Sequence, residues 1–139
     1  MPISQYLADA NLNWIRGTSF PAAPSSNIFI SLHSADPGYN GVNADVTTTL
    51  VPGGRVACPI TIFTAPADGP GATSRQMSND TLLSLTDSAA GPASATHFGL
   101  WSAQTGGNFL VYGLVSPAAN FLAGDIIRFP IGGLVIRGL

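Results

Sequence analysis

The side chains that could do chemistry are few, and two of them lie close together in the stretch SLHSADPG, at positions 31–38. A His/Asp pair such as His33 and Asp36 can belong to a nucleophilic triad or form half of a metal site, but either needs further convergent groups. Asp-Pro-Gly is also a strong turn signal, because Asp bonds the backbone ahead, Pro presets φ and Gly frees the exit. The sequence therefore predicts a half-exposed His33 at a strand end, followed by a turn that determines the fold. The turn residues are Asp36, Pro37 and Gly38.

The motifs of enzymes and metal sites are missing from this sequence. The chain has no glutamate and no lysine, and it contains no G-x-S-x-G, H-x-H, H-E-x-x-H or C-x-x-C pattern. Its single cysteine, Cys58, lies in the strand-like run VACPITIF and is expected to be a buried small hydrophobe, so no internal disulfide framework can form. We expect no catalytic residue, no metal ligand and no cofactor, and hence no enzyme.

Aromatic residues are concentrated in the stretch THFGLWSAQTGGNFLVYG, at positions 96–113. Gly106 and Gly107 sit in its connector and suit a hairpin turn, because glycine adopts positive φ without penalty. The two strands could present a carbohydrate-binding platform of Trp and Tyr. They could instead form a core hairpin whose second face meets another subunit, and this interpretation is favoured because strand aromatics usually pack in cores or interfaces.

Composition limits the partners. Only 9% of the 139 residues are charged and the net charge is −2, against a usual charged share of about 25%. Such a surface offers weak repulsion against association, so we expect a single domain that packs against neighbours. No basic patch is available for nucleic acid. No apolar run reaches the ~18 residues of a membrane span, and the first residues do not resemble a signal peptide.

The N-terminal segment is the one good helix candidate, because apolar residues recur there at three- and four-residue spacing and Gly17 follows as a stop signal. The stretch TSFPAAPSS should then be an extended linker. We expect residues 1–26 to form a helix and linker arm, and 27–139 a β domain. The apolar stripe consists of Ile3, Tyr6, Leu7, Ala10 and Trp14. The residues expected at an assembly interface are Ile3, Tyr6, Leu7 and Trp14.

From residue 27 the hydrophobic pattern has period two, which is typical of strands. About eight or nine short antiparallel strands separated by turn signals predict an all-β sandwich or jelly roll. Pro59 should mark its strand as an edge or as bulged. The expected strands are 27–33, 45–51, 55–63, one or two weak ones within 75–86, and then 96–102, 108–115, 125–131 and 133–138.

The order of these stretches resembles a family of small tailed-bacteriophage virion proteins that are usually labelled "phage tail fiber protein". Some similar members look like head decoration or head-fibre proteins. The resemblance covers nearly the whole chain, and its most specific parts are the stretches LHSADPG and THFGLWSAQTGGN. It implies a non-enzymatic structural role, assembly as a homotrimer, and location in the virion after assembly in the bacterial host cytoplasm.

Three functions follow as expectations. The first is a capsid decoration (cement) protein on the outer head surface, with itself and the phage major capsid protein as partners. The alternative is a tail-fibre or tail-associated structural or adhesion protein, whose partners are tail proteins. A further alternative is a glycan-binding module. Neither nucleic acid nor membrane is expected as a partner.

Overall fold

A computed structural model describes residues 3–24, 26–51, 53–72, 74–87, 93–121 and 124–138. Nine strands in antiparallel sheets and one short N-terminal helix lie within these residues, so the all-β prediction is confirmed. None of the helices in this part of the chain is long and apolar enough to cross a membrane. The helices are α1 (Gln5–Ile15), α2 (Thr47–Leu50) and the 3₁₀ turns η1 (Ile60–Ile62) and η2 (Pro70–Ala72). The strands are β1 (Asn27–His33), β2 (Val56–Pro59), β3 (Ala67–Asp68), β4 (Arg75–Ser78), β5 (Leu83–Asp87), β6 (Ala93–Trp101), β7 (Phe109–Phe121), β8 (Ile126–Phe129) and β9 (Val135–Gly138).

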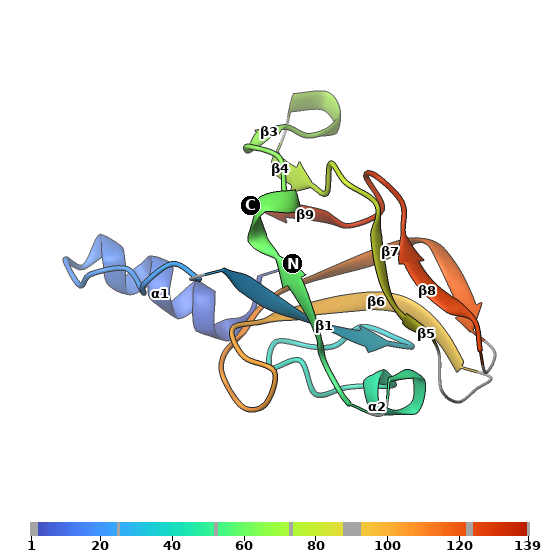
Figure 1. Ribbon diagram of the computed structural model, residues 1–139. Coiled ribbons are helices and arrows are strands. Elements are labelled where there is room, and N and C mark those ends of the chain that lie inside the picture. Colours follow the sequence, from blue (N-terminus) through green and yellow to red (C-terminus); the bar gives the residue numbers. More distant parts are fainter. Residues whose placement is uncertain are drawn as a thin grey trace.

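The largest sheet has the strand order β2-β1-β6-β7 (Figure 1). Its centre is the β1–β6 pair, in which Phe29 lies opposite Trp101 and His33 lies opposite His97. Strand β2 forms one edge of this sheet and ends at Pro59, as predicted from a proline that cannot donate to a ladder.

Two smaller sheets complete the domain, with the orders β3-β4-β9 and β5-β8. A bridge between Val115 and Leu134 joins β7 to the segment that leads into β9. The main core packs apolar residues of β1 and β6 against residues of β8 and β9. Its fully buried members include Ile30, Leu32, Phe98, Leu100, Ile127, Phe129 and Leu134.

Both faces of β1 are covered, because Ile28, Ile30 and Leu32 face the main core while the alternate residues face a second layer. Part of this layer is the segment 34–46, which runs back along the strand and donates Val46 N–H to the carbonyl of Leu32. The other part is an aromatic cluster, whose members are Trp101, Phe109, Tyr112 and the partly buried Phe29.

The expected strand at 45–51 is a short helix instead. Asp45 Oδ1 accepts the N–H of Thr47 at 2.8 Å, and the hydroxyl of Thr47 accepts the N–H of Leu32 at 2.9 Å. These side-chain bonds give the backbone an alternative to a strand ladder. Leu50 and Val51 then enter the main core from α2 and the residue after it. The prediction of a strand here was therefore wrong.

Helix α1 projects away from the strands and is fixed at its base (Figure 1). The side chain of Ser4 caps it by accepting Leu7 N–H at 3.2 Å. Backbone bonds run from Ser4 N–H to Leu110 O and from Gln5 N–H to Tyr39 O. At the far end, Gly17 has φ 92°, a conformation that glycine adopts freely as a helix stops.

Candidate functional site

His33 is wholly buried, so the prediction of a half-exposed imidazole was wrong. Its Nδ1 lies 2.8 Å from the carbonyl oxygen of Asn43, and its Nε2 lies 2.8 Å from Ser31 Oγ. Trp101 Nε1–H donates to the same Ser31 oxygen at 2.9 Å. A carbonyl can only accept, so Nδ1 carries the proton, and Ser31 donates its hydroxyl to Nε2. The chain Trp101–Ser31–His33–Asn43 is therefore fully satisfied with a neutral imidazole.

Ser31 and His33 have the contact of a nucleophile and its base, but their surroundings make the pair structural. Both residues have no exposed surface, and the serine oxygen already accepts from the indole of Trp101. Burial lowers the pKa of His33, and this outweighs the opposing effects of the Asn43 carbonyl and the Asp45 carboxylate. The network ties β1 to β6 and to the segment 34–46.

The Asp36–Gly38 segment forms a tight turn that leads into the pocket described below. Gly38 N–H donates to Asp36 Oδ1 at 2.8 Å, and Gly38 has φ 75°. A Cβ on Gly38 would lie 2.7 Å from the side chain of Asn43, and Pro37 between the two turn ends is fully buried. The turn therefore fixes where Tyr39 begins the next loop.

The connector between β6 and β7 contains two glycines with positive φ, as the sequence predicted: φ is 62° at Gly106 and 70° at Gly107. Ser102 and Asn108 close the connector, because Ser102 N–H donates to the Asn108 carbonyl at 3.0 Å and Ser102 Oγ accepts Asn108 N–H at 2.8 Å. These bonds hold Asn108 at the end of the connector, where its side chain faces solvent.

Arg55 also fixes the connector between β6 and β7, and its role was not predicted from the sequence. Its guanidinium carbon lies 3.5 Å from the centroid of the Trp101 ring, a cation–π contact. The same group donates to the carbonyls of Ala103 at 3.0 Å and Gly106 at 2.7 Å. Nothing in local spacing signals this contact, because its partners are distant in the sequence.

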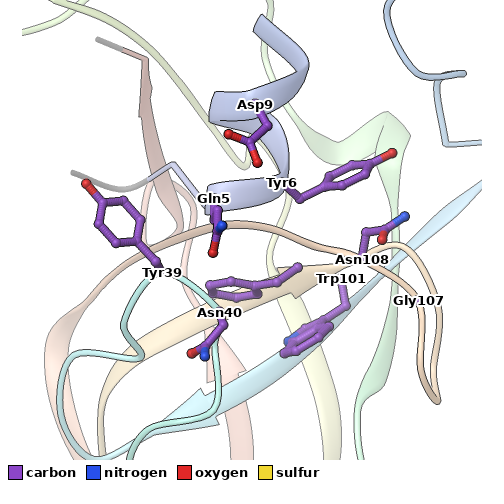
Figure 2. Close-up of a pocket in the computed structure, with 9 residues that line it drawn as sticks. Gln5, Tyr6, Asp9, Tyr39, Asn40, Trp101, Gly107 and Asn108 are labelled. Carbon is purple, nitrogen blue, oxygen red and sulfur yellow. The ribbon is translucent and has the colours of Figure 1, made fainter. Parts of the chain in front are cut away.

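An open pocket of about 310 Å³ lies between the base of α1 and the β6–β7 hairpin (Figure 2). Helix α1 forms one wall, the loop at 39–40 a second and the hairpin connector a third. Trp101 and Phe109 form the aromatic floor of the pocket, with ring centroids 4.8 Å apart and little exposed surface. The lining residues are Gln5, Tyr6, Asp9, Tyr39, Asn40, Trp101, Gly107, Asn108 and Phe109.

Two glycines allow the backbone to approach the aromatic floor of the pocket closely. A Cβ on Gly41, which has φ 74°, would lie 2.7 Å from the Phe109 ring and 2.8 Å from that of Trp101. A Cβ on Gly99 would lie 2.6 Å from Ser31 Oγ and 2.8 Å from Phe109. Any larger residue at either position would displace the aromatic floor.

The four residues expected at an assembly interface occupy different environments. Ile3 bridges Val111 of β7, and Tyr6 and Leu7 are half-buried near the base of α1. Trp14 at the distal end is 62% exposed. Leu12 and Ile15, which lie off the expected stripe, are also exposed, at 62% and 74%. The exposed apolar surface of α1 is thus at its distal end and consists of Leu12, Trp14 and Ile15.

Other reactive groups do not form a second site in the described part of the chain. Cys58 is fully buried, as expected, and burial raises the pKa of its thiol to about 11. No group of three His, Cys, Asp or Glu side chains that could hold a metal occurs among the residues that the structure describes.

Comparison with known proteins places this chain in a family. No curated protein matches the chain. A family model described as podophage GP4 fiber I protein gp80 matches residues 2–137, and this confirms the resemblance to phage fibre-type virion proteins. Because the match spans nearly the full sequence, the chain belongs to the family of the podophage GP4 fiber I protein gp80.

Proposed function

We propose that this chain is a non-enzymatic structural subunit of a phage fibre, and that it assembles as a homotrimer through the distal end of α1. The family, described as a fiber protein, is the observation that carries the fibre assignment. The exposure of Leu12, Trp14 and Ile15 supports self-assembly at the helix end. The trimeric state follows from the family resemblance noted in the sequence.

The physical argument for assembly rests on α1. Isolated helices of 11 residues are marginal in water, and most helical stability comes from packing an apolar face. The base of α1 packs on β7, but no α1 residue is fully buried. A second copy that covers Leu12, Trp14 and Ile15 would supply the missing packing. The low charge of the chain leaves little repulsion to oppose this.

Within the virion, we propose a position on the tail with tail proteins as partners, and the description of the family as a fiber protein supports this proposal. Decoration of the capsid is a second candidate, because the described residues form one compact β domain of the kind that can sit on a shell. A cement protein that binds only the assembled shell stabilises it by mass action, by about 2.7 kcal/mol per site at a hundredfold excess over the dissociation constant.

Two measurements test the proposal. Light scattering of the purified chain should give the mass of a trimer, and Leu12→Gln/Trp14→Gln/Ile15→Gln should lower it to that of a monomer while the circular dichroism stays β-rich. The matched control Asn11→Gln/Asn13→Gln changes exposed polar residues of the same helix and should stay trimeric. A monomeric wild-type chain would contradict self-assembly.

A density map of intact particles locates the chain. Density at the tail supports the fibre assignment, and density on the capsid lattice supports decoration. In the second case, particles that lack the chain should release DNA at a lower temperature than complete ones. Absence of the chain from purified particles would overturn both candidates.

A further inference from the structure

We propose that the open pocket at the base of α1 binds a neutral hexopyranose unit of a glycan. The pocket combines aromatic rings with side-chain amides around a volume of about 310 Å³, which lies at the lower end of the range for small-ligand sites. This inference goes beyond the structural role proposed above and does not depend on the oligomeric state.

The aromatic surfaces suit the apolar side of a sugar ring. A pyranose has a face of C–H groups that packs on an aromatic ring, while its hydroxyls point outward to polar partners. Tyr39 is 58% exposed at the edge of the pocket, and Tyr6 is half-buried on α1. In Figure 2 their rings stand on opposite sides of the space between α1 and the floor.

The polar groups suit hydroxyls that both donate and accept. Gln5, Asn40 and Asn108 each present an amide, which offers two donors and an acceptor. Within the described residues, none of these three amide groups forms a hydrogen bond to the protein, so each is available to a ligand. Asp9 adds a carboxylate, which accepts hydrogen bonds from sugar hydroxyls.

The charge of the lining selects against anionic ligands. Among the described residues that line the pocket, none is basic and Asp9 is the one carboxylate. Arg55 lies behind Trp101 and its guanidinium is used by the carbonyls of Ala103 and Gly106. A phosphate, a uronic acid or a sialic acid would meet an unfavourable carboxylate without a compensating cation.

The floor is rigid before any ligand arrives. Trp101 is held by its bond to Ser31 and by Arg55 on its ring, and Phe109 packs between Trp101 and Tyr112. A preformed floor reduces the ordering cost of binding. The pocket is open, so one hexose should bind weakly, with a dissociation constant on the order of 1 mM.

The test is saturation-transfer NMR on the intact chain with methyl glucoside, methyl galactoside, methyl mannoside and N-acetylglucosamine, with glucuronic acid as the anionic comparison. At least one neutral sugar should receive saturation, and glucuronic acid should receive much less. Tyr39→Ala and Asn40→Ala should each weaken binding at least about tenfold, while Asn11→Ala, on the exposed part of α1, should leave it unchanged.

Absence of transfer to every neutral sugar, equal transfer to glucuronic acid, or full binding by both pocket variants would each overturn the proposal. Circular dichroism and light scattering on the same samples separate this result from the proposed assembly, because a chain that assembles normally without binding sugar contradicts the pocket alone.

Discussion

His33 shows how burial changes the role of a side chain. In the folded chain burial favours the neutral imidazole, whose Nε2 accepts from Ser31. The unfolded chain protonates near the ordinary histidine pKa of about 6.5. The depressed pKa therefore contributes stability that is fully present above about pH 6.5 and is lost as the pH falls towards the folded value.

We predict that the free energy of unfolding falls between about pH 7 and about pH 5.5, by at most about 1.4 kcal/mol per pH unit from this group. His33→Gln should be less stable at neutral pH and should show a flatter slope. Asn11→Gln, an exposed change on α1 that alters no titratable group, should keep the wild-type slope. Urea titrations at several pH values measure this, and equal slopes for His33→Gln and wild type would contradict it.

Arg55 provides a second test at the scale of one residue. Arg55→Lys keeps the charge but loses the planar group that stacks on Trp101 and bonds two carbonyls. We expect a loss of roughly 1–2 kcal/mol in urea unfolding. Arg75→Lys alters an ion pair with Asp68 whose side chains are 61% and 64% exposed, and should cost less than about 0.5 kcal/mol. Equal losses for the two variants would show that the Trp101 contact is unimportant.

Local chemistry at the residue scale was predictable, but distant contacts were not. The Asp-Pro-Gly signal and the apolar setting of Cys58 are properties of neighbouring residues, so the sequence carries them directly. The bond from His33 to Asn43 depends on a loop that folds back over β1. The contact of Arg55 with Trp101 joins the residue before β2 to the β6–β7 hairpin through the tertiary fold. Neither has a local pattern.

Elements with strong periodicity followed the sequence closely. Strand β1 covers Asn27–His33, the range that its alternation predicts, and the N-terminal helix stops before Gly17. The prediction of a strand at 45–51 was wrong because Asp45 and Thr47 bond the backbone with their side chains. Strand β7 continues to Phe121, beyond the expected 108–115, because β6 starts early enough to pair with it.

The pocket was only partly predictable from the sequence. The sequence directed attention to Trp101 in the aromatic hairpin and to Tyr6 in the helix, each for its own local pattern. Their approach to Asn40 requires the bonds that anchor α1 to β7 and to Tyr39. No local spacing encodes that approach, so the pocket could be found only in the folded chain.

Loop geometry at the pocket gives a prediction at the scale of an element. Gly41 and Gly54 have similar φ angles, 74° and 83°, but only a Cβ at Gly41 would meet other atoms within 4 Å. Gly54→Ala should therefore cost about 1 kcal/mol from backbone strain alone. Gly41→Ala should cost several kilocalories per mole and shift the Trp101 fluorescence, because the loop must move off the aromatic floor. Similar losses for both variants would contradict this account.

At the scale of the whole molecule, sparse charge predicts a stability that depends little on ionic strength. Only 9% of residues are charged, and the pair of Arg75 and Asp68 is exposed. Screening therefore removes little favourable energy. Calorimetry between about 0.05 M and about 1 M sodium chloride should shift the midpoint of unfolding by less than ~5 °C. A large fall at high salt would show that ion pairs contribute more than burial suggests.

The attachment of the N-terminal segment to β7 also covers part of an edge of the four-stranded sheet. Strand β7 is the outer strand of the four-stranded sheet, and an open outer strand invites another chain to hydrogen-bond along it. Ile3 and Ser4 occupy this side of β7 at Val111 and Leu110, and Leu134 occupies it at Val115. The opposite outer strand, β2, is short and ends in Pro59. Where copies of the chain come close together, we therefore expect the four-stranded sheet to resist edge-to-edge pairing at these positions.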